Sequence, residues 1–268
     1  MALVDDYNKA LNQIDREYTR IESAALSDLA STTRQAVRDV AAVVADSDTS
    51  QPNAILQSAI NRIITRYQQS VTGRIRQLFE QVSELGADSV TEPLAAIDEP
   101  TQRADTSQLL EVVFGSASIV GAGIGDTMRQ AINTQLRLNF LGNFSSAKLM
   151  SNIRQSIRGK LNGIRTAVRS EAARAYNMAH LLQAKAANRL SRDSLLKDWI
   201  TKGDKRVRDT HRTAGRAKPI PVNQLFIVGS DKLRFPGDPR GSAKEVINCR
   251  CRMKIIHPKV LKNAKQAA

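Results

Sequence analysis

Apolar side chains recur at alternating steps of three and four residues through the first part of the chain. The first series consists of Val4, Tyr7, Leu11, Ile14, Tyr18, Ile21 and Ala25. This spacing predicts a long amphipathic helix with a coiled-coil-like seam, running to about Val44. A second series begins near Pro52 and ends at Gly86, which is typical of a helix C-terminus. Together they predict an antiparallel helical hairpin, whose seam is either the interior of a bundle or a surface for other copies or a ring-shaped partner.

The periodicity lapses after the second helix. Residues 87–106 mix Pro, Asp, Thr and Ala and predict a linker, and a Gly-rich run follows, which makes 87–125 one connecting segment. The glycines lack the spacing of a dinucleotide or P-loop motif, so they predict close helix packing or a hinge. The uncharged apolar stretch Val112–Gly125 is shorter than the ~20 residues that span a bilayer as a helix. We therefore expect no membrane-spanning helix, with membrane contact by this stretch as an alternative.

Helical periodicity returns in a basic region over residues 126–192, with one helix expected from Ser146 to about Ala187. Gly159 and Gly163 lie inside this helix and predict a bend or a break. Beside its apolar stripe falls a row of arginines: Arg154, Arg158, Arg165 and Arg169. The row is either a solvated face, a binding site for nucleic acid, or a contact with an acidic protein.

Charge favours the nucleic-acid interpretation. The chain holds 40 Lys and Arg against 26 Asp and Glu, a net charge of +14. Residues 1–100 hold 9 basic and 15 acidic residues, whereas residues 145–268 hold 28 and 8. A basic surface attracts a phosphate backbone. Because aromatic residues make up only 4% of the chain, there is little to stack on single-stranded bases, so we expect non-specific contact with double-stranded DNA.

The remaining residues predict a small α+β module over 196–258, followed by a basic tail over 259–268. The expected elements are a strand at Trp199, a helix capped by Asp204 and ending at Gly215, a hairpin around Gly229, a short helix opened by a capping box from Ser242 to Glu245, and a strand over Cys249–Ile256. The predicted fold class is therefore mainly α, with an acidic N-terminal hairpin over residues 1–86 and a small C-terminal α+β module.

The order and spacing of residues in this module are distinctive. The set comprises Trp199, Asp204, Arg206, Arg208, His211, Gly215, Phe226, Pro236, Asp238, Asn248, Cys249, Arg250 and Cys251. It resembles the phage Mu F-like family of minor head, or head morphogenesis, proteins. Residues 168–177 are similar to the Arg-Thr-Glu helix that precedes the module in that family, with Ser170 in place of Thr. The resemblance covers about residues 165–256, a third of the chain.

The resemblance implies a structural minor capsid protein rather than an enzyme, with no cofactor. Such a protein is made in the host cytoplasm and becomes part of the virion, inside the capsid near the portal vertex. The partners implied are the portal protein, the major capsid protein or both, packaged double-stranded DNA, and further copies of the chain. In some members of the family the protein leaves the head with the DNA.

The module also offers candidate chemistry. His211, Cys249, Cys251 and His257 are soft ligands that a zinc ion could use, although their spacing is not a standard one. The alternative is a half-buried thiol pair in a reducing compartment, since a disulfide between such close positions would be strained. Asp204 and His211 raise the further alternative of a metal-dependent nuclease or other phosphoryl-transfer enzyme. A structural role, in which Asp204 and the arginines tie the module together around Trp199 and Phe226, is the simpler hypothesis.

Overall fold

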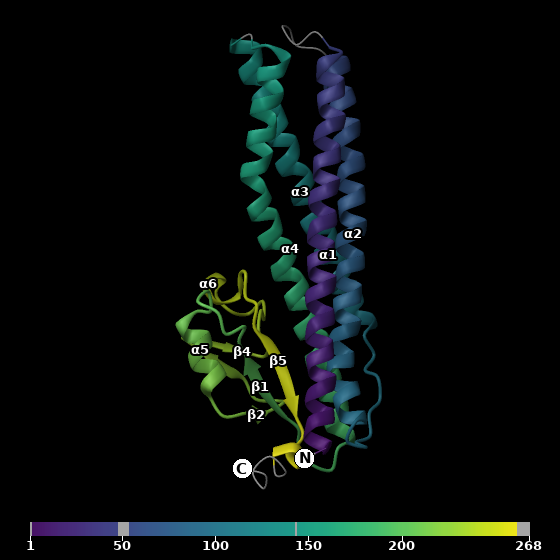
Figure 1. Cartoon of the computed structure of the whole chain (residues 1–268), viewed down its shortest axis with the longest axis vertical. Coiled ribbons are helices and arrows are strands. Elements are labelled where there is room, and N and C mark those ends of the chain that lie inside the picture. The colour runs from purple at the N-terminus through teal and green to yellow at the C-terminus, as the bar shows by residue number, and fades with distance from the viewer. Residues whose placement is uncertain (1, 48–53, 143, 262–268) are drawn as a thin grey trace. The chain divides into compact units, whose positions relative to one another are not determined.

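Four long helices precede a small module of short strands and helices (Figure 1). The computed structural model describes residues 2–47, 54–142 and 144–261. The long helices are α1 (Ala2–Ala45), α2 (Ala54–Ala95), α3 (Ser107–Gly142) and α4 (Ser146–Leu190). The predicted fold class, mainly α with long N-terminal helices and a small C-terminal α+β module, is confirmed. Pro52 and residues 262–268 of the basic tail lie outside the described residues.

The chain forms two compact units, and both are assembled from separated segments. Unit 1 consists of Met1–Glu22, Leu78–Val113 and Arg169–Ala268, and unit 2 of Ser23–Gln77 and Phe114–Val168. Each of the four long helices therefore contributes residues to both units. The segments expected over 1–86 and 126–192 are each divided between the two units.

Unit 1 contains the module and its sheet. The strands are β1 (Leu196–Ile200), β2 (Ile220–Pro221), β3 (Phe226–Val228), β4 (Asp231–Leu233) and β5 (Arg252–Ile256). β1 lies between β2 and β5 in an antiparallel sheet, and β3 and β4 form the predicted hairpin. The core of unit 1 joins Trp199 and Met253 of this sheet to Tyr7 of α1 and Leu94 of α2.

The apolar seam of α1 is buried within the chain. In unit 1, the exposed fractions of Tyr7, Ile14 and Tyr18 are 1%, 3% and 5%. In unit 2, Thr33 of α1 and Tyr67 of α2 are hydrogen-bonded through their hydroxyl groups, 2.8 Å apart. These buried positions make the seam an intramolecular core, and the alternative of a surface offered to other copies is not retained for them.

The predicted helix end at Gly86 is wrong, because α2 continues to Ala95. A Cβ atom at Gly86 would overlap the carbonyl oxygen of Tyr176 in α4, so this glycine permits a close helix contact and does not end the helix. The buried residues Ala87, Val90 and Leu94 continue the apolar stripe beyond it. The linker expected over 87–106 is therefore reduced to the segment between α2 and α3.

The Gly-rich run lies inside α3, and one of its glycines makes the close helix contact that the sequence predicts. A Cβ atom at Gly121 would overlap the side chain of Thr72 in unit 2.

The helix α3 is long and apolar enough to cross a membrane by length and composition: an 18-residue window has a mean hydropathy of 1.4, with 33% of it buried. The uncharged stretch considered in the sequence is thus part of a longer apolar helix, and core helices of soluble proteins share these properties.

Three local expectations also need correction. Of the predicted bend or break at Gly159 and Gly163, the break is wrong, because α4 is one continuous helix through both glycines. The helix expected from Asp204 is α5 (Asp209–Arg216), because the Asp204 carboxylate accepts a hydrogen bond from the backbone N–H of Arg206 in the preceding turn. The cysteines precede β5, so they are not on a strand.

Candidate functional site

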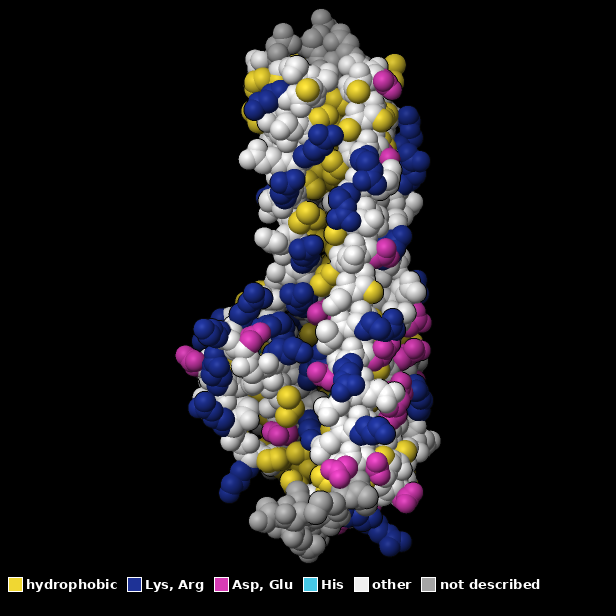
Figure 2. All heavy atoms as spheres, in the orientation of Figure 1, with side chains coloured by type: hydrophobic (Ala, Val, Ile, Leu, Met, Phe, Trp, Pro, Cys, Tyr) yellow, Lys and Arg dark blue, Asp and Glu magenta, His cyan; other side chains and the backbone are white. Residues whose placement is uncertain are grey.

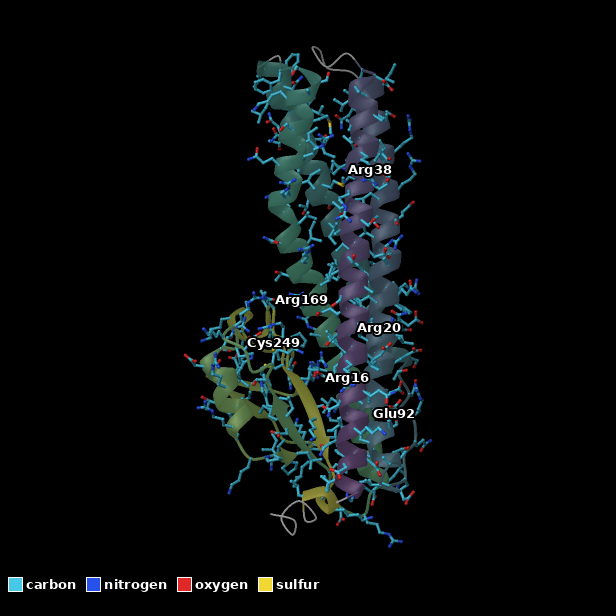
Figure 3. The ribbon with its side chains drawn as sticks, viewed as in Figure 1. Arg16, Arg20, Arg38, Glu92, Arg169 and Cys249 are labelled. Atoms are coloured by element: carbon cyan, nitrogen blue, oxygen red, sulfur yellow. The ribbon has the colours of Figure 1, made fainter. Side chains whose placement is uncertain are left out.

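A groove of about 420 Å³ in unit 2 combines an apolar floor with a basic rim. The floor is formed by Ala30, Val37, Ile157 and Leu161. The rim is formed by the exposed arginines Arg34 and Arg38 of α1 and Arg154, Arg158 and Arg165 of α4. Figure 2 shows dark blue side chains bordering the strip of yellow atoms between these helices, and Arg38 is labelled on α1 in Figure 3.

Unit 2 has a strong excess of positive charge. Its segments contain 13 Lys and Arg against five Asp and no Glu, a formal charge of +8. Within the described part of unit 2, the salt bridges are Arg74 with Asp28 and Arg129 with Asp126. The groove arginines thus have no carboxylate within salt-bridge distance there, and five like charges repel one another across the groove.

The structure divides the four arginines predicted from the sequence. Arg154, Arg158 and Arg165 lie on the groove, whereas Arg169 belongs to unit 1 and pairs with Glu22 of α1 at 3.3 Å. Sequence reasoning missed Arg34 and Arg38 because they occur in the acidic first hundred residues. Their i, i+4 spacing on α1 was the available signal.

A second candidate site is a buried cluster in the module of unit 1. His211 of α5 places its Nδ1 atom 3.3 Å from Cys251 Sγ and 3.7 Å from Cys249 Sγ. All three side chains are buried, and the His211 ring lies edge-on to Trp199, with ring centroids 5.2 Å apart. His257 is not part of the cluster, since its ring contacts Ser191 and Glu99.

Glu245 completes this cluster from α6 (Ala243–Val246). Its Oε2 atom lies 3.1 Å from His211 Nε2 and accepts a hydrogen bond from the Thr210 hydroxyl at 2.9 Å. The predicted capping box is wrong, because Ser242 donates its hydroxyl to Asp231 and makes no side-chain cap. Sequence reasoning therefore missed Glu245 as a partner of His211.

The two cysteines perturb each other. The pKa of Cys249 is lowered, chiefly by its hydrogen bond with Cys251, although burial acts against this. The pKa of Cys251 is raised by its contact with Cys249 and by burial. Cys249 is therefore the more acidic thiol of the pair.

Two of the motif residues form a surface clamp. Arg250 makes two hydrogen bonds to the Asp204 carboxylate, at 2.6 and 2.7 Å, which lower the pKa of Asp204 to about 2. Arg208 donates to the carbonyl oxygen of Ile247 at 2.6 Å. Because Asp204 is held by Arg250 and His211 by Glu245, the two residues of the nuclease alternative have separate partners.

The loop that carries Pro236 is organised by Asp238, whose side chain is fully buried. Burial alone would raise the pKa of Asp238, but hydrogen bonds from Arg234 and the backbone N–H of Arg240 lower it to about 2. Trp199 and Phe226 form the small core as predicted, with ring centroids 5.3 Å apart. Asp238 is thus a structural acid of the loop.

Three polar side chains of α4 contact the module: Ser170, Arg174 and Asn177. The Ser170 hydroxyl accepts a hydrogen bond from the backbone N–H of Asn248, which has a left-handed φ of 55° that Asn tolerates well. Arg174 donates to Gly237 O at 3.2 Å. The side-chain amide of Asn177 donates to Cys251 O and accepts from the backbone N–H of Met253.

A further cavity lies beside the two cysteines in unit 1. It measures about 190 Å³ and is lined by Cys249, Cys251, Tyr18, Arg169 and Arg206, among others. Arg169 and Cys249 are both labelled in Figure 3. The cysteines are therefore buried yet adjacent to open space.

Comparison with known proteins gives no assignment. No family model, no curated protein and no solved structure matches the chain. The sites are therefore interpreted from their own residues and geometry.

Proposed function

We propose that this chain is a structural minor head protein of a tailed phage, located inside the capsid near the portal, and that unit 2 binds packaged double-stranded DNA without sequence preference. The motif order in the module supports the head-protein part of the proposal. The observation that carries the DNA-binding part is the groove rim of five arginines in a unit of formal charge +8. Arg169 is left out of the DNA contact because Glu22 already neutralises it.

The arginine rim suits a phosphate backbone in both charge and arrangement. Arg154 and Arg158 are four residues apart on α4, and Arg34 and Arg38 repeat this spacing on α1. Each phosphate that an arginine contacts releases condensed counterions, so binding is favoured entropically and weakened by salt. The proposed contact requires no base recognition, in keeping with the scarcity of aromatic residues.

The decisive experiment measures the affinity of the full chain for duplex DNA at several salt concentrations. Replacing Arg154, Arg158 and Arg165 with Ala should weaken binding at least tenfold at low salt, because each lost phosphate contact removes about 0.9 from the log–log salt slope. We expect a reduction of the slope by about 2 to 3.

The control removes the same charge from elsewhere in unit 2. The exposed residues Arg62, Arg66 and Arg137 do not line the groove, and their triple Ala variant should retain most of the wild-type slope. Equal losses in the two variants would show that only net charge matters and would remove the role proposed for the groove. The position of the chain relative to the portal in intact particles tests the remainder of the proposal.

A further inference from the structure

We infer that His211, Cys249 and Cys251 bind a zinc ion. The three side chains come from α5 and from the segment before β5, 38 residues further along the chain, and are 1%, 2% and 3% exposed. One ligand atom from each lies within 4.8 Å of the others. This inference is independent of the proposed DNA contact, which lies in unit 2.

The distances match those that a tetrahedral ion imposes. With Zn–S bonds of about 2.3 Å and Zn–N bonds of about 2.0 to 2.1 Å, tetrahedral angles separate nitrogen and sulfur by about 3.6 Å. The distances from His211 Nδ1 to the two sulfur atoms are 3.3 and 3.7 Å. Both separations between nitrogen and sulfur are therefore close to those around a tetrahedral zinc ion.

The orientation of the imidazole is already fixed in the way that zinc requires. Glu245 Oε2 lies 3.1 Å from His211 Nε2 and accepts the proton on that nitrogen. The lone pair is then on Nδ1, the atom that faces the two sulfurs. Thr210 in turn donates to the same Glu245 oxygen, which holds the carboxylate in place. A carboxylate that orients a ligating histidine in this way is typical of zinc sites.

Water from the neighbouring cavity would supply the fourth ligand. Both cysteines line this cavity of about 190 Å³, together with Tyr18. The Tyr18 hydroxyl is buried and has no hydrogen-bond partner within the described ranges. Two thiolates and one imidazole favour zinc over harder ions such as Mg²⁺, which prefer oxygen ligands.

The test measures zinc in the full chain, purified reduced from zinc-containing medium and desalted. We expect about one zinc per chain by elemental analysis. Replacement with Co²⁺ should give thiolate-to-cobalt charge transfer in the near ultraviolet and the intense visible bands of a tetrahedral site. Less than a tenth of an equivalent of zinc, or a disulfide between the two cysteines in the native chain, would overturn the inference.

Single variants assign the ligands. Cys249→Ser, Cys251→Ser and His211→Asn should each lose at least nine-tenths of the zinc, whereas His257→Gln, which changes another buried histidine of unit 1, should retain it. Zinc content equal to that of His257→Gln in any of the three would exclude that residue as a ligand. Glu245→Gln tests the positioning role and should weaken zinc affinity about 10- to 100-fold without changing the stoichiometry.

Removal of the metal from the wild-type chain gives a readout that does not depend on variants folding. A chelator should lower the melting temperature recorded through Trp199, which stacks edge-on against His211. Zn²⁺ should restore it and Mg²⁺ should not. An unchanged melting temperature with the zinc demonstrably removed would contradict a structural ion at this place.

Discussion

Single residues in the module have partners that local sequence cannot reveal. The spacing of Ser242 and Glu245 predicts a helix cap, yet Glu245 contacts His211, 34 residues away. A carboxylate three residues after a serine can accept a hydrogen bond from the helix N-terminus or from a distant side chain such as His211. The fold decides which of these two donors lies beside it. The cysteines and His211 could be proposed as a cluster from the sequence because their residue types are rare and chemically specific.

Burial of His180 in α4 makes the stability of the folded chain depend on pH. It is fully buried in unit 1, which lowers its pKa to about 3. Ser89 donates its hydroxyl to Gly86 O, so its oxygen accepts the proton on His180 Nδ1. The folded chain therefore keeps His180 neutral under conditions in which the unfolded chain protonates it.

The sign of the effect follows from the two pKa values. The free energy of unfolding is unaffected by protonation of His180 above about pH 6.5, the pKa of an exposed histidine. It falls as the pH drops from there toward 3, because only the unfolded chain binds the proton. Between pH 7.5 and 5, we expect His180 to account for a loss of about 2 kcal/mol in the free energy of unfolding. Denaturant titrations of the wild type and His180→Gln measure this contribution, and an identical pH dependence in both would refute it.

At the scale of elements, periodicity predicted where helices exist better than where they end. α1 and α4 were predicted within a few residues, because apolar stripes over forty residues admit few alternatives. The end of α2 was predicted wrongly because glycine has two roles that look alike in sequence. It can end a helix, or it can lie within a helix where a neighbouring backbone comes close. Only the contact with Tyr176 distinguishes them.

Alanine substitutions separate these two kinds of glycine. Gly86→Ala should lower the free energy of unfolding by about 1 to 3 kcal/mol, because the new methyl group meets the backbone of α4. Gly159→Ala in α4, where no atom lies within 4 Å of the added Cβ, should raise it by up to about 1 kcal/mol. Chemical denaturation followed by circular dichroism compares them; a stabilised Gly86→Ala variant would contradict the close contact.

For the whole molecule, charge along the sequence did not predict charge in space. The acidic segments Met1–Glu22 and Leu78–Val113 belong to unit 1 with the basic module, where Asp15 pairs with Arg252 and Glu99 with Lys259. Unit 2 is basic and contains no glutamate. An acidic half and a basic half were visible in the sequence, but discontinuous units mix them, and no count along the chain can show this.

The association of α1 with β5 in unit 1 gives a test at this scale. Tyr7 donates its hydroxyl to the carbonyl oxygen of Ile255, and the side chain of Lys254 donates to Asn8 at 3.2 Å. Tyr7→Phe leaves a buried carbonyl without this donor and should cost about 1 to 2 kcal/mol of stability. Fluorescence of Trp199, the single tryptophan, should report the loss although Tyr7 is in the first helix.

A matched variant in unit 2 provides the control. Tyr67→Phe removes another buried hydroxyl, the one bonded to Thr33, and should shift the transition of Trp199 less than Tyr7→Phe does. If Tyr7→Phe left the Trp199 transition unchanged, the coupling of α1 to the sheet would be disproved.

The contact between Tyr7 and Ile255 spans 248 residues of sequence and also orders events during synthesis. The segments of unit 2 are complete once Val168 has been translated, so this unit can fold on the ribosome. Unit 1 cannot close until β5 emerges, and until then the apolar seam at the start of α1 stays exposed on the nascent chain. The residues of α1 that belong to unit 1 are thus translated long before β5 can bury them, and their apolar side chains remain open to other contacts during that interval.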